Sequence, residues 1–219
     1  NQVVCNNTAT NAVNFSTTNT NGTTSYAWSI NTNIGLSPLT GTGDLPSFTA
    51  INTGTTPITA TITVTPTYNG TSICNGTSKT FTITVNPSGQ VNQPTNQVVC
   101  NNTATSTVNF STTNTVGTTS YAWSFDTNIG LIPLTGSGNI PSFTAINTGT
   151  TPIVATITVT PTFTNGATNC IGSSKTFTIT VNPSAQVNPI PNQTLCSNNS
   201  TTAINFTTNN TGGITNYNW

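Results

Sequence analysis

The chain is almost free of charge. Its 219 residues include two Lys, two acidic residues and no Arg, Glu or His, so the formal net charge is zero. Proteins that bind nucleic acid carry a basic surface, and anionic membranes attract clusters of Lys and Arg. The composition therefore argues against both kinds of partner. No apolar run approaches the roughly eighteen residues of a membrane span, so we also expect no membrane insertion.

Residue types that carry out chemistry are equally scarce. General acid–base catalysis uses His, Asp or Glu in suitable pairs, and a hydrolytic nucleophile needs a base within hydrogen-bond reach. The only carboxylates, Asp44 and Asp126, fall at different positions of the internal repeat described below, so no repeat has a pair. Calcium requires several oxygen ligands, and a thiolate metal site requires clustered Cys or His. We therefore expect no enzyme activity, no metal and no cofactor.

Hydrophobic residues are few, but the composition is not that of a disordered chain. They make up 32% of the residues, below the usual proportion of about 45–50%. Disordered chains combine low hydrophobicity with high net charge, whereas this chain is uncharged and rich in β-branched residues, with Thr about a quarter of the total. Thr favours strands and Asn favours turns, so the composition predicts β-structure.

An internal repeat determines the expected architecture. The sequence matches itself at an offset of 95 to 96 residues, which aligns Cys5 with Cys100 and Cys196, and Trp28 with Trp123 and Trp219. A unit of this length fits an immunoglobulin-like sandwich and is too long for a solenoid rung. The predicted domains are residues 1–90, residues 91–187 and a truncated third copy at residues 188–219. The lack of Met agrees with a piece of a longer chain.

Strands are predicted by alternation of apolar and polar residues. Between Pro57 and Pro66, the apolar residues at 58, 60, 62 and 64 alternate with Thr, which is typical of a half-buried strand. The segment around Phe81, Ile83 and Val85 repeats this pattern and ends before the polar linker SGQVNQPT. Further strands are expected over residues 12–17, 25–30 and 47–51. No segment has a helical period, so the fold class is predicted to be all-β.

The cysteines predict disulfides. Each full repeat holds two, and we expect Cys5 to pair with Cys74 and Cys100 with Cys170, which leaves Cys196 as the first cysteine of the truncated copy. A bond across the linker between Cys74 and Cys100 stays open as an alternative. Structural disulfides are typical of an oxidising, extracytoplasmic compartment.

The strand TSYAWSFDTN resembles the core strand of PKD domains. Tyr121 and Trp123 match that motif in the second copy, and Tyr26 and Trp28 match it in the first. The resemblance implies that these four residues belong to a sandwich core. The run from GTGDLPSFTAINTGTTPI to TFTITVNP is similar to PKD-like repeats of very large Bacteroidota surface proteins, and the likeness covers nearly the whole chain. The acidic Gly-Asp-Gly turn of PKD domains is missing, so no role tied to that turn can be transferred.

The resemblance implies tandem immunoglobulin-like domains in a cell-surface adhesin, of a class that includes the gliding-motility kind. It also implies export by type 9 secretion, attachment to the outer membrane and contact with the gliding machinery. We expect a stalk that projects a distal binding region, with neighbouring repeats of the same chain as its main partners. Two alternatives stay open. The Thr-rich repeats could bind glycan or surfaces directly by avidity, or the chain could be the subunit of a self-assembling extracellular filament.

Overall fold

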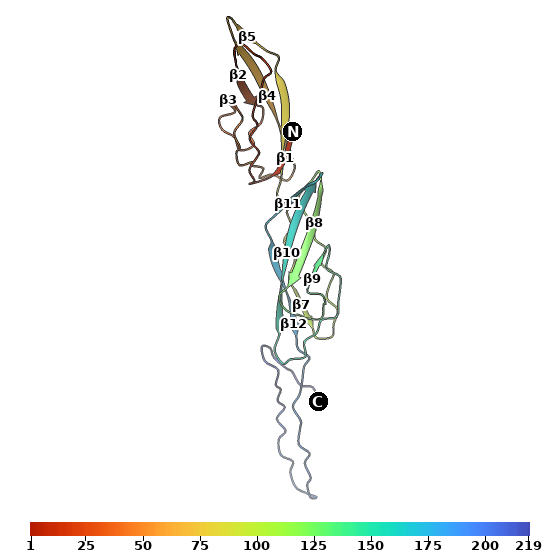
Figure 1. Cartoon of the computed structure of the whole chain (residues 1–219). Helices are drawn as coiled ribbons and strands as arrows, with labels where there is room; N and C mark the ends of the chain where they lie inside the picture. Colours follow the sequence, from red (N-terminus) through yellow and green to blue (C-terminus); the bar gives the residue numbers. More distant parts are fainter. The chain divides into compact units, whose positions relative to one another are not determined.

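The computed structural model describes residues 1–219 and contains strands, turns and loops without any helix. No segment could therefore cross a membrane as a helix. Two six-stranded sheets have the same strand order, one in each full repeat (Figure 1). The predicted all-β class, with tandem sandwich-like repeats, is confirmed.

The sheet of the first repeat has the order β1-β6-β4-β2-β3, with β5 paired to β4. Strand β1 runs parallel to β6, and the other pairs are antiparallel. Because β4 pairs with β2 along one edge and with both β5 and β6 along the other, it is the centre of the sheet. The bounds are β1 Gln2–Cys5, β2 Thr23–Ile30, β3 Thr40–Thr42, β4 Ile58–Asn69, β5 Ile73–Asn75 and β6 Lys79–Asn86.

The second repeat contains a sheet of equivalent order, β7-β12-β10-β8-β9, with β11 paired to β10. Strand β7 is again parallel to its neighbour β12. The bounds are β7 Gln97–Cys100, β8 Thr118–Phe125, β9 Thr135–Ser137, β10 Ile153–Asn165, β11 Thr168–Ile171 and β12 Lys175–Asn182.

The chain divides into two compact units that differ from the sequence repeats. The first residues of β8 and the last residues of β10 group with the first repeat. Most of the rest of the second repeat groups with the start of the third. Unit 1 comprises Asn1–Asn92, Ser111–Tyr121 and Thr160–Ser174, and unit 2 comprises Gln93–Phe110, Ala122–Val159 and Lys175–Trp219. The domain boundaries at 90 and 187 therefore stay a prediction.

Strand β4 alternates as expected, but it continues through Pro66 to Asn69. The predicted end at Pro66 is wrong for a geometric reason. Pairing of β4 with β6 ends at Val64, and pairing with β5 begins at Thr67. Pro66 lies in this gap, where its carbonyl accepts the N–H of Gly76 (2.8 Å) and its own missing N–H interrupts no ladder.

The second layer of each repeat is less regular than predicted. Residues 12–17 and 47–51 do not form strands, and only isolated bridges join Ala9 to Thr49 and Val13 to Leu45. The prediction at residues 25–30 is confirmed by β2. Short loop segments that meet at single bridges can still cover one face of the sheet, because their apolar side chains point inward.

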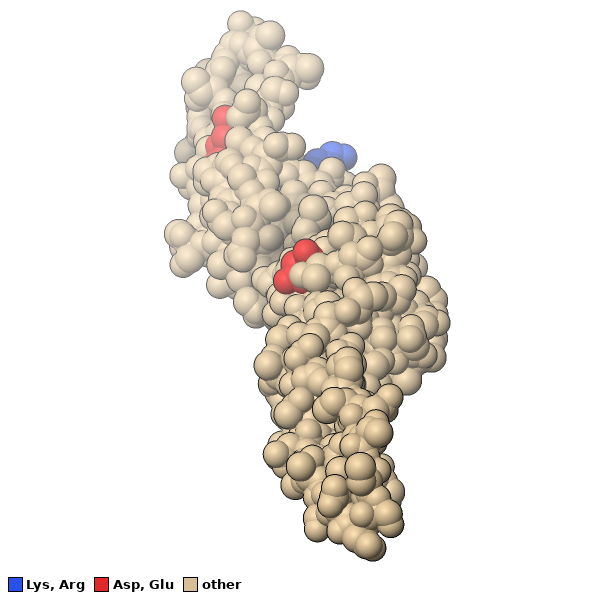
Figure 2. Space-filling model, turned by 90° about the horizontal axis from the view of Figure 1, so that it is seen from below, with Lys and Arg blue, Asp and Glu red and all other residues tan.

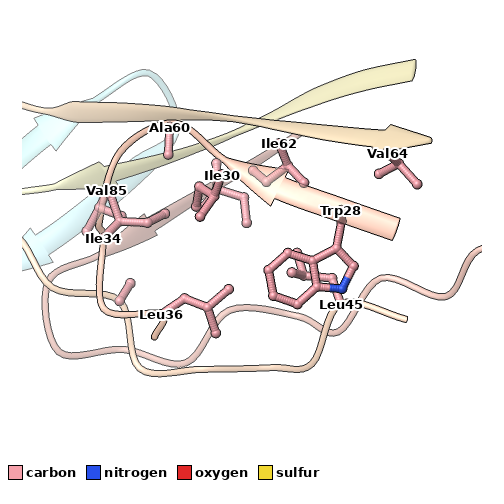
Figure 3. Packing of buried hydrophobic residues seen from close by; sticks show 11 residues of the cluster. Trp28, Ile30, Ile34, Leu36, Leu45, Ala60, Ile62, Val64 and Val85 are labelled. Atoms are coloured by element: carbon pink, nitrogen blue, oxygen red, sulfur yellow. The ribbon is translucent and has the colours of Figure 1, made fainter. Parts of the chain in front are cut away.

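The core of the first repeat lies between the sheet and these loop segments. Trp28 is 7% exposed and packs with the buried residues shown in Figure 3, where strand residues Ile62 and Val64 lie on one side and loop residues Leu36 and Leu45 on the other. Trp123 is 8% exposed in the second repeat. Tyr26 and Tyr121 are only partly buried. The structure therefore places both indoles in cores and both phenols at their margins.

A glycine lies against each indole. Gly41 pairs with Trp28, and a β-carbon at Gly41 would come within 2.2 Å of the Trp28 ring. Gly136 stands in the same relation to Trp123, also at 2.2 Å. Only a residue without a side chain fits on the adjacent strand at this position.

A buried asparagine fixes the loop that leads into β4. The Asn52 side chain is 2% exposed and donates to the carbonyls of Val85 (2.7 Å) and Thr56 (2.8 Å), while its oxygen accepts the N–H of Gly54 (3.0 Å). Asn147 makes the same three bonds in the second repeat. A buried amide that satisfies three backbone groups cannot be replaced without leaving them unpaired.

We expect Asn52→Ala to destabilise the protein by about 2–4 kcal/mol, because three buried backbone groups lose their partner. The control is Asn11→Ala, at an exposed position where the second repeat has Ser106. That substitution should stay within about 0.5 kcal/mol. Urea unfolding at neutral pH measures both effects. Equal shifts in the two variants would contradict a special role for the buried amide.

Candidate functional site: the linker and disulfide junction

The two carboxylates act as acceptors for backbone N–H groups. Asp126 Oδ1 accepts the N–H of Thr156 at 2.8 Å, and in the first repeat Asn31 Oδ1 accepts the N–H of Thr61 at the same distance. Asp44 and Asn139 form a second such pair, with acceptor distances of 2.8 and 3.0 Å to Phe15 and Phe110. Because an amide replaces the carboxylate at each equivalent position, the role common to both is that of a hydrogen-bond acceptor.

The Asp126 carboxylate is exposed, and its hydrogen bonds with Thr156, first of all from the backbone N–H, lower its pKa. The structure contains no cluster of three or more Cys, His, Asp or Glu side chains that could hold a metal ion. Figure 2 shows a face on which charged residues are isolated spots in an otherwise uncharged surface. Candidate chemistry must therefore be sought among the cysteines and the neutral polar groups.

The structure joins Cys5 to Cys170, with 5.4 Å between their α-carbons. Cys74, Cys100 and Cys196 are free and exposed. The expected pairings of Cys5 with Cys74 and of Cys100 with Cys170 are therefore wrong, and so is the alternative between Cys74 and Cys100. A disulfide does form, but between the first cysteine of one repeat and the second cysteine of the next.

The length of the central strand explains this correction. Cys5 lies beside Asn86, at the end of the sheet where Ile58 begins β4. Cys74 pairs with Tyr68, ten residues further along the same strand. At about 3.3 Å per residue, the two cysteines are held roughly 33 Å apart, whereas a disulfide needs α-carbons within about 7 Å.

Close backbone packing accompanies the disulfide within unit 1. The N–H of Gly89 donates to the carbonyl of Cys170 at 3.0 Å. A β-carbon built on Gly172 would lie 1.6 Å from the Gly89 carbonyl oxygen, so only glycine fits there. The linker and β11 therefore approach each other directly, backbone against backbone.

The segment after Gly89 is bound by residues 111–115, also within unit 1. The N–H of Gln90 donates to Asn114 Oδ1 (2.7 Å), and the Asn114 amide group donates to the Ser88 carbonyl (3.2 Å). Asn92 donates from its backbone to the Ser111 carbonyl (2.8 Å) and from its side chain to Ser111 Oγ (2.9 Å). Val91, between these anchors, is 4% exposed. The linker is thus an ordered, partly buried element.

The same set of bonds recurs in unit 2, where the next linker meets the start of the third copy. Gln186 donates to Asn210 Oδ1 (2.8 Å), and Asn210 donates to the Ser184 carbonyl (3.1 Å). Asn188 donates twice to Thr207, at 2.8 and 2.9 Å. In both places, the residue after the anchoring Asn donates to a loop carbonyl, Thr115 to Thr55 (3.0 Å) and Thr211 to Thr150 (2.9 Å). The linker contact is therefore a repeated feature.

Sequence reasoning treated SGQVNQPT as a polar linker and missed this binding. A signal was present, because the three residues Gln-Val-Asn at 90–92 recur at 186–188 while their neighbours change. The recurrence marks a bound backbone in both linkers, although Val91 is buried and Val187 is 53% exposed.

A scan against protein-family models finds no match, and a search of curated proteins finds none. Among solved structures, the chain is similar to extracellular domains 3–5 of Drosophila OTK, at 12% identity over 83% of this chain and 61% of that chain, with a TM-score of 0.22. It is also similar to cadherin-like domains 1 to 4 of zebrafish RET, at 15% identity over 74% and 41% of the two chains, with a TM-score of 0.28. Tandem Ig repeats of Dlar match at 10% identity over 84% and 94%, with a TM-score of 0.25.

The three descriptions are of extracellular domains, of cadherin-like domains and of tandem Ig repeats, respectively. The chain spans less than two thirds of the length of the OTK and RET chains. Similarity this low says nothing about function. The assignment to the all-β class therefore depends on the strand pairing described above.

The acceptor role of Asp126 predicts a pH effect. Its pKa is lower in the folded state, so it contributes stability above the unfolded pKa of about 3.9, and this is lost as the pH falls through the folded pKa. Asp126→Asn keeps an acceptor at every pH. We expect it to match the parent near pH 7 and to lose less stability between about pH 5 and pH 2.

The matched control is Asn31→Asp, which places a carboxylate at the equivalent position of the first repeat. This variant should gain the acid sensitivity that Asp126→Asn loses. Urea midpoints across the pH range measure both. Identical pH profiles for the parent and both variants would refute the assignment.

Proposed function

We propose that the chain is part of the structural repeat region of a secreted cell-surface adhesin. In this role the repeats act as a spacer that presents a distal binding region. The observation that carries the proposal is the recurrence of one linker junction: the same four hydrogen bonds form within residues 88–115 and within residues 184–211, and a fifth joins Thr115 to Thr55 and Thr211 to Thr150. Copies that are joined in a constant way suit a repeated structural element.

The Cys5–Cys170 disulfide supports an extracellular location, because such bonds persist in oxidising compartments. The finer assignment that we propose is to the Bacteroidota surface adhesins, a class that includes the gliding-motility type, which are exported by type 9 secretion and held at the outer membrane. That assignment has its support in the PKD-like resemblance of the Trp strand and of the segments on either side of β4.

We propose further that the chain has no enzymatic role. Both carboxylates bind backbone N–H groups and are replaced by amides in the neighbouring repeat. A group that an uncharged amide can replace contributes neither a proton donor nor a nucleophile.

A second candidate function is direct binding of glycan by the outer face of the sheets. Thr residues of neighbouring strands lie opposite each other on this face, and the hydroxyls of Thr59 and Thr84 are 2.9 Å apart. Rows of uncharged hydroxyls can hydrogen-bond to sugars. Repetition along the chain would raise a weak affinity by avidity.

One experiment separates the two functions. In cells that display the full-length protein, residues 1–95 are deleted in frame, which removes one complete repeat and keeps the register because Asn96 is equivalent to Asn1. A spacer should keep its adhesion strength while the distance of adhesion shortens. Single-cell force spectroscopy measures both quantities.

The control replaces the partly exposed pair Thr61 and Thr82, which face each other on β4 and β6, with Lys in every repeat under test. This should leave adhesion unchanged if the repeats are spacers. Adhesion that falls with the number of repeats and is abolished by the Lys substitutions would favour direct glycan binding instead.

A further inference from the structure

We propose that the first cysteine of each repeat pairs with the second cysteine of the following repeat, which makes Cys100 the acceptor site for a strand equivalent to β11. The partner is defined by its chemistry: a short strand with a cysteine at the position of Cys74 and Cys170. This inference concerns covalent connectivity and goes beyond the proposed spacer role.

Cys100 is held in the same way as the bonded Cys5. Each ends a strand parallel to the last strand of its sheet, Cys5 beside Asn86 and Cys100 beside Asn182. The carbonyl of each cysteine accepts the hydroxyl three residues ahead, at 2.7 Å in both repeats. Cys100 is free and exposed, whereas Cys5 is bonded. The two cysteines therefore have the same local structure, and they differ in that only Cys5 forms a disulfide.

The complementary half of the bond is equally reproducible. Cys74 pairs with Tyr68 on β4 as Cys170 pairs with Phe163 on β10. Cys170 is 1% exposed in its disulfide, while Cys74 is exposed and free. Cys74 is thus an unbonded second-position cysteine at the position that Cys170 occupies in the next repeat.

The third copy approaches the second through the same junction. Gln186, Asn188 and Asn210 repeat the bonds made by Gln90, Asn92 and Asn114. Residues 188–219 cover the third copy only as far as Trp219, which is equivalent to Trp28, and so stop before the second-cysteine position. A segment that carries this cysteine would meet Cys100 as β11 meets Cys5.

Each new bond forms from two thiols, which lose two electrons and two protons as the sulfur–sulfur bond is made. The oxidant is a protein disulfide, which is reduced to two thiols, or molecular oxygen, which takes up the two electrons and two protons to form hydrogen peroxide. In a series of repeats, every bond would then span a linker, and each internal repeat would be bonded to both neighbours.

The test extends the chain so that the third repeat is complete. A copy of residues 29–92 is added after Trp219, and Cys74→Ser is introduced in the original position so that the added cysteine has a unique peptide. We expect non-reducing peptide mapping to find Cys100 linked to the added cysteine, with Cys5–Cys170 intact and Cys196 free. The intact Cys5–Cys170 bond serves as the internal control for folding.

A bond between Cys196 and the added cysteine, or a free added cysteine beside an intact Cys5–Cys170 bond, would overturn the proposal. A second arm identifies the source of the partner strand. The unextended chain is oxidised in air at low and high concentration. A dimer that forms only at high concentration and links Cys74 to Cys100 or Cys196 would identify a second copy, whereas a link in the extended monomer identifies the continuing polypeptide. Dimers that join like positions, Cys74 to Cys74, would contradict the pairing rule.

A different observation supports a second inference, that a groove in the first repeat binds an extended Gln-Val-Asn segment. A cavity of about 520 Å³ in unit 1 is lined by Phe15, Tyr26 and Phe81 together with the polar residues Ser16 and Asn19. The ring centroids of Phe15 lie 5.5 Å from Tyr26 and 6.5 Å from Phe81. The groove therefore combines an aromatic floor with hydrogen-bonding groups.

The equivalent residues bind this segment twice elsewhere in the chain. Ser16 and Asn19 correspond to Ser111 and Asn114, which hold Gln90 and Asn92, and to Thr207 and Asn210, which hold Gln186 and Asn188. In both cases a Val lies between the two anchoring residues. The groove thus has the chemistry to bind a linker of the same kind ahead of Asn1.

The test adds a copy of residues 88–95 before Asn1, which reproduces the order found ahead of Asn96. We expect hydrogen exchange in residues 13–19 to slow at least about tenfold relative to the unextended chain. The matched control carries Asp in place of the added Val and should show no slowing, since a carboxylate would be placed against the aromatic rings. Equal slowing in both extended chains, or none in either, would refute the groove assignment.

Discussion

The central strands β4 and β10 impose the constraint from which most other features follow. Strand β4 pairs over Ile62–Asn69 with β2 on one edge and with β6 and then β5 on the opposite edge, and β10 has the equivalent neighbours β8, β12 and β11. A strand of 12 or 13 residues places its first and last pairs about 40 Å apart. The two cysteines of a repeat are tied to opposite ends of this strand, so an internal disulfide is geometrically excluded. The covalent link must then reach beyond the repeat.

Neutral polar groups replace charges throughout the structure. Asn52 and Asn147 bind the loops before the central strands, and Asn114 and Asn210 bind the linkers. Asn31 accepts the backbone N–H of Thr61, as Asp126 accepts that of Thr156 in the next copy. Hydrogen bonds between uncharged groups are not weakened by dissolved ions, whereas attraction between exposed charges is screened within about 10 Å at 0.1 M salt. A junction made from amides, hydroxyls and backbone groups therefore keeps its geometry across a wide range of salinity.

The sequence predicted the regular part of the fold because that part depends on local patterns. The alternation of Ile58 to Val64 with Thr determines which face of β4 is buried, and the burial of the strand follows it residue by residue. Pro66 was misjudged because its effect depends on which neighbour its N–H would meet, and that neighbour is distant in the sequence.

The pairing of cysteines and the binding of the linker depended on information that spacing does not contain. Nearly equal intervals between Cys5 and Cys74 and between Cys100 and Cys170 suggested bonds within repeats, but an interval does not tell at which end of a sheet each residue lies. Similarly, the Gln-Val-Asn segment of the linker could be recognised as a repeat, while its binding partners, Ser111 and Asn114, became visible only in the folded chain.

The junction also explains why some segments recur without change while others vary. The segment NQVVCNNTAT contains the disulfide cysteine Cys5 and also Asn6, whose side chain accepts the N–H of Asn52 (2.8 Å). The segment SFTAINTGTTPI contains Asn52 and Thr55, whose carbonyl accepts the N–H of Thr115. Residues in these segments satisfy a partner inside their own repeat and another across the linker. A substitution there would disturb two sets of contacts at once, so the stability of each copy depends on its neighbour, as in other repeat proteins. Positions such as Asn11, which becomes Ser106 in the second copy, make no such double contact with their side chains and are free to differ.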